Sequence, residues 1–198
     1  MTRAQAELWV WRHPRVEGAD QRCIGRADPA PDPRRARRLA DRIRRTARRH
    51  GLARYVVSSP SRRCAAVARW LRRWGWRHER FEALLEMDFG DWEGRAWSDI
   101  GREPVEAWCA DFLCHRPGGG ESLVDMLARV GAWQAPPGTV VVAHAGWMLA
   151  RRWLERGDGL PEHAGQWPAA PRHGELWLLP AACLPLPAPA QPEPAHGA

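Results

Sequence analysis

The chain has 198 residues, of which 44% are hydrophobic and 27% are charged, as is ordinary for a soluble globular protein. This length accommodates one domain with a sizeable core, whereas two domains would be cramped. The sequence contains no apolar run long enough to span a bilayer, and it does not open with the apolar segment of a secretion signal. We therefore expect a cytoplasmic protein with no membrane partner.

All 30 basic residues are arginines, and the chain carries a net charge of +7. Basic proteins can bind nucleic acid. However, much of this charge lies in residues 34–49, where apolar residues recur at helical spacing. We interpret this stretch as an amphipathic helix with a solvated basic face, and we predict no nucleic-acid partner. A mild positive field that attracts anionic substrates is compatible with this composition.

The residue types that several enzyme classes need are missing or scattered. The five cysteines form no Cys-x-x-Cys pair, and the eight histidines are dispersed. We therefore expect reduced thiols, no metal site and no cofactor. The chain has no lysine, which excludes a P-loop NTPase. No cysteine is followed six residues later by the arginine that a cysteine-based phosphatase uses.

Strand and helix patterns alternate along the chain. The first strand, 7–12, is followed by a Pro-rich loop and then by the basic helix, which opens near Pro33. We further expect strands at 54–59, 139–143 and 175–179, and helices at 61–74, 97–112, 122–133 and 146–155. Residues 77–96 are predicted to be irregular. One domain at 1–180 is then followed by a Pro- and Ala-rich disordered tail at 181–198.

This alternation predicts an α/β domain with a mainly parallel sheet, in which ligands bind beyond the carboxyl ends of the strands. Reactive side chains follow three of these strands: Arg12 and His13, then Arg62 and Arg63, and finally His144. Convergent guanidinium groups suit a phosphate, and a neutral histidine among them can attack phosphorus. A lone histidine after a strand is usually structural, but three such strand ends point to a phosphate site.

The segments that carry these residues resemble the motifs of the histidine phosphatase superfamily. In chain order they are LWVWRHP (8–14), VVSSPSRRCAAVA (56–68), LLEMDFGDWEG (84–94), PGGGES (117–122) and VVVAHAG (140–146). No single motif would indicate the family, but five motifs in the family's order are a strong signal. The resemblance implies a three-layer α/β/α sandwich similar to phosphoglycerate mutase, and hydrolysis of phosphomonoesters through a phosphohistidine. The chain looks too short to hold the insertions of a mutase.

The resemblance also implies a role for each matching residue. His13 matches the nucleophile, and Arg12, Arg63 and His144 match the residues that bind the phosphate. Glu86 matches the general acid and base, which protonates the leaving oxygen and then helps to activate water.

The sequence offers alternatives for the arginine and for the glutamate. The family's arginine directly precedes a small residue, here Cys64, so Arg63 is preferred to Arg62. The spacing by itself does not distinguish Glu86 from Glu79 or Glu82.

The chain departs from the family pattern at some positions. Pro14 replaces the glycine after the nucleophile and offers no N–H, and Ser61 replaces a leucine. A more literal signature, Arg172-His173-Gly174-Glu175, comes before a strand rather than after one. We interpret it as a coincidence, with His173 at the opposite edge of the sheet or in a loop.

Within the superfamily, the chain is most similar to α-ribazole phosphatases of cobalamin synthesis. Their Cys-Tyr-Gly-Arg-x-Asp segment appears as Cys23 to Asp28, with Ile24 in place of the tyrosine. The resemblance implies that Arg26 helps to line the substrate pocket. The substrate would be α-ribazole 5′-phosphate or adenosylcobalamin 5′-phosphate.

Two alternatives stay open. One is a broad-specificity histidine phosphatase that acts on small sugar or carboxylic-acid phosphates. The other is a non-catalytic binding module that keeps the phosphate pocket but uses its arginine surface for a partner. The partner that we expect is a small phosphorylated metabolite, and we expect the protein to be a monomer or a homodimer.

Overall fold

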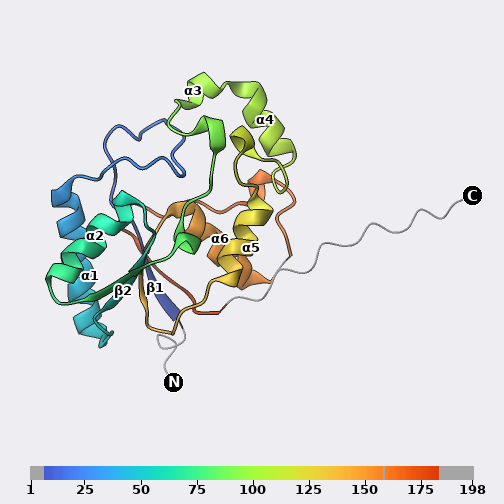
Figure 1. Ribbon diagram of the computed structural model, residues 1–198. Coiled ribbons are helices and arrows are strands. Elements are labelled where there is room, and N and C mark those ends of the chain that lie inside the picture. The colour runs from blue at the N-terminus through green and yellow to red at the C-terminus, as the bar shows by residue number, and fades with distance from the viewer. Residues whose placement is uncertain (1–6, 158, 183–198) are drawn as a thin grey trace, which may run out of the picture.

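The computed structural model describes residues 7–157 and 159–182, which form an α/β domain around a five-stranded sheet (Figure 1). The sheet order is β3-β2-β4-β1-β5. All neighbouring strands are parallel except β5, which runs antiparallel to β1. The strands are β1 (Glu7–Arg12), β2 (Tyr55–Ser58), β3 (Arg77–Arg80), β4 (Val140–Ala143) and β5 (Leu176–Pro180).

Helices cover both faces of the sheet (Figure 1). On one face lie α1 (Pro33–His50) and α2 (Arg62–Arg73), and on the other lie α5 (Leu123–Ala132) and α6 (Ala145–Arg156). Successive side chains of a strand point to opposite faces. Accordingly, Trp9 and Trp11 of β1 pack with the first helix pair, whereas Leu8 and Val10 pack with the second. This arrangement confirms the predicted three-layer α/β/α sandwich.

Local sequence signals set the ends of the helices. The Asp32 carboxylate accepts a hydrogen bond from the backbone N–H of Arg34 at the start of α1, and Gly51 ends that helix in a left-handed conformation. Helix α5 begins with a capping box between Ser122 and Asp125. The basic side chains of α1 face outward, and its apolar residues are buried against the sheet.

Two predicted elements were wrong in detail. Residues 77–96 include a strand, β3, which pairs with β2 at the outer edge of the sheet. Its sequence, Arg-His-Glu-Arg, is polar throughout, so no alternation of apolar residues marks it. The helix predicted at 97–112 is broken at Gly101, whose φ is +86°, into α3 (Trp97–Ile100) and α4 (Arg102–Ala110).

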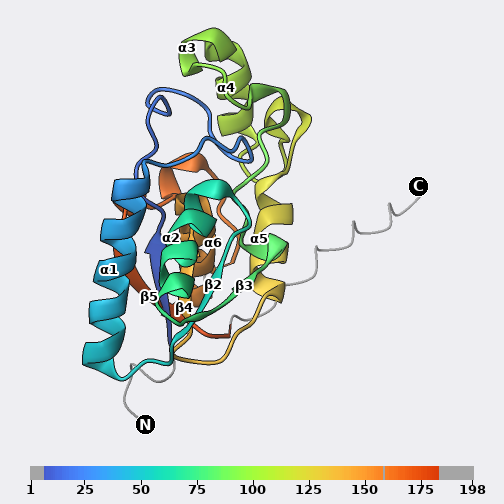
Figure 2. The same ribbon diagram turned by 60° about the vertical axis from the view of Figure 1, so that its left-hand side comes forward.

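The carboxyl edge of the parallel strands is covered by polypeptide rather than open to solvent. Figure 2 shows α3, α4 and the loop between β1 and α1 at this end of the sheet. The loop is fastened to residues 92–97: the Cys23 N–H donates to the carbonyl of Arg95, and the Gly94 N–H donates to the carbonyl of Cys23. A covered edge provides the walls of a binding site.

Across the described part of the chain, no helix combines the length and the apolar character needed to cross a membrane. Most of the predicted tail, 183–198, lies outside the described residues. The domain boundary at residue 180 and the disorder of the tail therefore stay predictions.

Candidate active site

The structure brings the ends of β1, β2 and β4 together at one site. The pairing of Arg12 with Ala143 places His13 beside His144, with their ring centroids 5.2 Å apart. Arg63, in the first turn of α2, reaches the same place and donates a hydrogen bond from Nε to Nδ1 of His144 over 3.2 Å. The sheet topology thus groups three of the predicted residues.

The His13 side chain is held as a neutral imidazole. Its Nδ1 lies 2.8 Å from the carbonyl oxygen of Pro14, and because a carbonyl can only accept, Nδ1 carries the proton. Burial, and the nearby charge of Arg63, hold the pKa of His13 well below its ordinary value. No hydrogen bond within the described residues occupies Nε2. His13 therefore has the protonation state of a nucleophile.

His144 is also neutral, because burial and the charge of Arg63 hold its pKa well below the ordinary value. Its Nδ1 accepts from Arg63, so its proton lies on Nε2, which donates to the Ser59 hydroxyl over 2.8 Å. A dianion at the site would favour the charged imidazolium again. Ser59 is thus a residue of the site to which the sequence assigned no role.

The Arg63 guanidinium is buried, with 1% of the residue exposed, whereas Arg62 is exposed. Besides His144, Arg63 donates to the carbonyls of Gly25 and Ala27. The neighbouring Asp28 carboxylate lies 3.8 Å from Nη1. The segment that resembles α-ribazole phosphatases is therefore fastened directly to the site.

Arg12 lies beside His13 and is partly buried. Its Nη1 donates to the carbonyl of Pro171 over 2.7 Å. Its Nε is buried without a hydrogen-bond partner among the described residues. A buried donor of this kind is costly unless an acceptor reaches it, so Arg12 can bind an anionic oxygen.

Glu86 approaches the histidines from the loop after β3. Its Oε2 accepts a hydrogen bond from the backbone N–H of Gly146 over 3.0 Å, and its Oε1 accepts from that of Met87. Burial raises the pKa of Glu86, although these two hydrogen bonds and the arginines Arg63 and Arg12 oppose the rise. The carboxyl group thus stays protonated to a higher pH than an exposed glutamate.

The two other glutamates that the spacing allowed lie elsewhere. Glu79 is on the edge strand β3, where it pairs with Arg77, and Glu82 opens the short helix that follows this strand.

Of the two positions predicted for His173, the loop is confirmed and the opposite edge of the sheet is wrong. Because β5 is antiparallel to β1, the start of β5 lies at the edge where the parallel strands end. His173 is in the turn before β5, with its ring centroid 5.3 Å from that of His13, and its Nδ1 lies 3.3 Å from the His13 carbonyl oxygen. It therefore lies beside His13 and contacts the backbone of that residue.

The sequence profile of branch 1 of the histidine phosphatase superfamily matches residues 8–167. The chain belongs to this superfamily. No curated protein matches the chain. The fold is similar to that of a solved structure named mycobacterial hydrolase 1, with a TM-score of 0.68 and 25% identity over 87% of this chain and 88% of the other.

Two further solved structures carry more specific names. Mycobacterial glucosyl-3-phosphoglycerate phosphatase, in complex with inorganic phosphate, has a TM-score of 0.67 and 25% identity over 87% of this chain and 88% of its own. The α-ribazole phosphatase of Shigella flexneri has a TM-score of 0.65 and 22% identity over 92% and 99%. At 22% identity the second likeness shows the fold alone.

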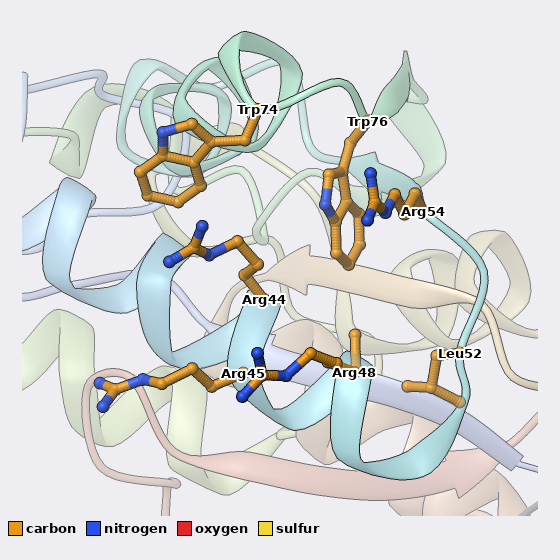
Figure 3. Close-up of a pocket in the computed structure, with 8 residues that line it drawn as sticks. Arg44, Arg45, Arg48, Leu52, Arg54, Trp74 and Trp76 are labelled. Atoms are coloured by element: carbon orange, nitrogen blue, oxygen red, sulfur yellow. The ribbon is translucent and has the colours of Figure 1, made fainter.

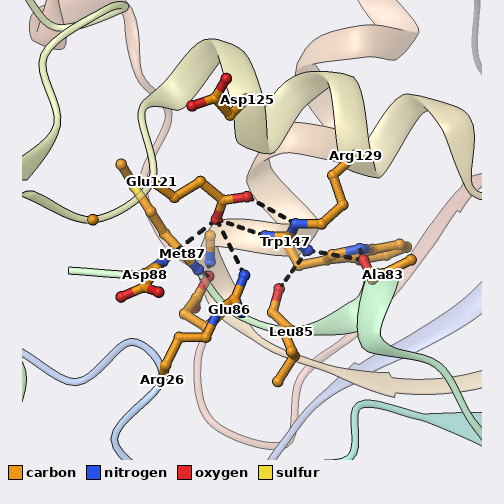
Figure 4. A network of polar contacts seen from close by, with 12 residues as sticks. Arg26, Ala83, Leu85, Glu86, Met87, Asp88, Glu121, Asp125, Arg129 and Trp147 are labelled. Carbon is orange, nitrogen blue, oxygen red and sulfur yellow. Dashed lines mark hydrogen bonds and ion pairs between the residues drawn. The ribbon is translucent and has the colours of Figure 1, made fainter. Parts of the chain in front are cut away.

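A polar network holds the loop of this histidine phosphatase that carries Glu86 (Figure 4). Arg129 and Glu121 form a two-pronged ion pair, with both N–O distances at 2.8 Å. Nη1 of Arg129 also donates to the carbonyls of Ala83 and Leu85, each over 3.0 Å. Two carbonyls just before Glu86 are thus fixed by one guanidinium.

Arg26 is attached to this network from the other side. Its guanidinium lies 3.9 Å from Oε2 of Glu121 (Figure 4), and its backbone N–H donates to the carboxylate of Glu93. The side chain is 38% exposed. A role for Arg26 in binding substrate stays a prediction.

A second arginine-rich feature lies far from the site. A hollow of about 390 Å³ beside α1 is lined by Arg44, Arg45 and Trp74, among others. Figure 3 shows the Arg44 side chain beside the Trp74 ring. Leu52, which precedes β2, also lines it, so it lies toward the opposite end of the sheet. Asp41 pairs with both arginines, as expected for a solvated basic face. The absence of a nucleic-acid partner stays a prediction.

No group of three or more metal-ligating side chains occurs among residues 7–157 and 159–182. Cys64 lies next to His144, with Sγ 3.5 Å from Nε2. Burial raises the pKa of the Cys64 thiol, so this group is a poor nucleophile.

Gly146 leads to a first prediction. A Cβ atom at this position would lie 2.3 Å from Oε1 of Glu86, so Gly146→Ala must displace the carboxyl group. Because misplacement of a catalytic group by about 1 Å can cost about 100-fold, we expect phosphatase kcat to fall by at least tenfold in assays with alkyl phosphates.

Gly131→Ala is the matched control, since its Cβ would meet only Leu154, at 3.4 Å. We expect this variant to keep the wild-type rate. Equal rates for both variants would mean that the carboxyl position does not matter.

Proposed function

We propose that the protein hydrolyses phosphomonoesters through a phosphohistidine on His13. The observation that carries this proposal is the state of the His13 ring. Its Nδ1 is fixed by the Pro14 carbonyl, it is neutral, and it lies near the buried Arg63 and the partly buried Arg12. A neutral imidazole held beside phosphate-binding groups is ready to attack phosphorus.

The phosphate group would lie between Arg12, Arg63 and His144. The unpaired Nε of Arg12 offers it a donor. Arg63 and a protonated His144 supply positive charge in a buried setting, where electrostatic stabilisation of the transferring phosphoryl group is strong. No metal ion enters this scheme.

The reaction takes two steps. Nε2 of His13 attacks phosphorus, the bond from phosphorus to the ester oxygen breaks, and the alcohol leaves with a proton from Glu86. Water then attacks the phosphohistidine, its proton passes to the Glu86 carboxylate, and phosphate leaves His13. The raised pKa of Glu86 suits the first step, which needs a protonated acid near neutral pH.

For the substrate, we propose α-ribazole 5′-phosphate or adenosylcobalamin 5′-phosphate, which would make this an enzyme of cobalamin synthesis in the cytoplasm. The support is the segment Cys23 to Asp28, which supplies two carbonyl contacts to Arg63. The second candidate is a small sugar or carboxylic-acid phosphate, which the similarity to glucosyl-3-phosphoglycerate phosphatase favours. A non-catalytic binding module is the weaker alternative, because it gives no reason for a neutral His13 beside Glu86.

The test compares kcat/KM, without added metal, for α-ribazole 5′-phosphate, 3-phosphoglycerate and a panel of sugar phosphates. We expect α-ribazole 5′-phosphate to exceed the others by at least about 100-fold, the range in which specific polar and apolar contacts discriminate substrates. His13→Ala should abolish hydrolysis of all of them. Equal kcat/KM values across the panel would contradict the ribazole assignment, and an active His13→Ala variant would contradict the mechanism.

A further prediction concerns Arg129, which we assign to the positioning of Glu86. Alkyl phosphates need an acid to protonate the departing alkoxide, whereas p-nitrophenyl phosphate has a stable leaving group. Because an acid contributes about 100-fold or more, Arg129→Met should lower kcat on an alkyl phosphate by about tenfold more than on p-nitrophenyl phosphate.

Arg116→Met is the control, because it removes an arginine whose ion pair with Asp125 is more exposed. Its rates on the two substrates should change by the same factor. Equal losses on both substrates in Arg129→Met would show that Arg129 does not act through Glu86.

A further inference from the structure

A cavity of about 180 Å³ lies beside Glu86, and its walls are apolar. Glu86 is the only charged residue among those that line it. The apolar walls come from distant parts of the chain: Ile24, Phe89, Trp108, Phe112, Met126 and Trp167. We call this feature the aromatic cavity.

Aromatic rings in contact with one another form much of its wall. Phe89 meets Trp108 edge to face, with ring centroids 5.7 Å apart, and Trp108 lies tilted against Phe112 at 5.9 Å. Phe112 and Trp167 are in edge contact at 5.9 Å, and Trp153 stacks behind Trp167 at 5.5 Å. Contacts of these kinds fix the rings relative to one another. The aromatic cavity is therefore built in advance of any ligand.

Trp108 contributes a donor that nothing in the described chain uses. Its Nε1 is buried and has no hydrogen-bond partner among residues 7–157 and 159–182. By contrast, the indole N–H groups of Trp147 and Trp153 donate to backbone carbonyls, each over 2.9 Å. A buried donor without a partner is costly, and an acceptor that reaches it recovers that cost.

The aromatic cavity lies where the leaving alcohol of the substrate would be placed. Gly146 lines the cavity and donates its backbone N–H to Glu86, and it stands two residues after His144. Glu86 thus borders both the phosphate-binding side chains and the cavity. An ester oxygen protonated by Glu86 would carry the rest of its alcohol toward the aromatic cavity.

We propose that the aromatic cavity binds a flat apolar ring in the alcohol part of the substrate, and that a ring acceptor atom receives the Trp108 N–H. An apolar protein cavity of about 150 Å³ is large enough to bind benzene. The polar groups of a sugar or a carboxylate in the same place would lose their hydrogen bonds to water without gaining hydrogen bonds to the protein. This inference rests on the proposed phosphatase function, and it restricts the substrates to monoesters of ring-bearing alcohols.

The experiment uses three alkyl phosphates whose alcohols have similar acidity: 2-(pyridin-3-yl)ethyl, 2-phenylethyl and n-butyl phosphate. The first two differ only in a ring nitrogen that accepts a hydrogen bond, and the third has no ring. We expect kcat/KM to rise at least about tenfold from n-butyl to 2-phenylethyl phosphate and a further threefold or more to the pyridyl ester, mainly through KM.

Trp108→Phe keeps the ring and removes the N–H. It should abolish the advantage of the pyridyl over the phenyl ester, a ratio that does not depend on how much of the variant is folded. Trp9→Phe is the matched control, because it removes an indole N–H that is equally buried and unpaired but lies in β1, toward α1 and away from the cavity. Its ratios should equal those of the wild type.

The outcomes separate this inference from the proposed function. Equal kcat/KM for all three esters would overturn the aromatic cavity as a ring site and leave the phosphatase mechanism standing. A pyridyl advantage that survives in Trp108→Phe would overturn the role of its N–H. Failure to hydrolyse any of the esters, and p-nitrophenyl phosphate as well, would overturn the proposed function and this inference with it.

Discussion

A buried arginine organises this protein. The guanidinium of Arg63 is withdrawn from water, and its contacts are two backbone carbonyls, a neutral imidazole and one carboxylate at 3.8 Å. Burial of a charge without a close counter-ion is unfavourable. The site therefore has a strong preference for an anion, and a phosphate dianion would satisfy it.

The same charge determines the protonation of its neighbours. Together with burial, it keeps His13 and His144 neutral, so that one histidine can act as a nucleophile and the other can donate to Ser59. Burial shifts the pKa of Glu86 in the opposite direction, upward, so this group also favours its neutral form, which is the acid. One buried environment thus favours both a neutral imidazole that can act as a nucleophile and a neutral carboxyl group that can act as an acid.

The sequence predicted most of the sheet and the grouping of His13, Arg63 and His144, because buried parallel strands are strongly apolar and their ends meet at one edge. It could not predict β3, since an edge strand needs no apolar alternation. It allowed the opposite edge of the sheet as one position for His173, which was wrong. The pattern of β5 identifies a strand but carries no information on its direction, and an antiparallel strand begins where its parallel neighbours end.

Other features of the site depend on contacts between distant segments. Nothing in the sequence indicates that Gly146 must lack a side chain because Glu86 lies against it, or that Arg129 holds the carbonyls before Glu86. Ile24 is a further example. In the sequence it is only a departure from the tyrosine of the resemblance, whereas in the structure it forms part of an apolar wall.

If the phosphoryl group passes through His13, this residue is phosphorylated during turnover and can be identified. The enzyme is mixed with substrate, quenched within its first turnover under alkaline conditions and digested into peptides that separate His13 from His144 and His173. We expect acid-labile phosphate on the His13 peptide and on neither of the others. Phosphate on His144 or His173, or rapid turnover with no phosphorylated histidine, would contradict this mechanism.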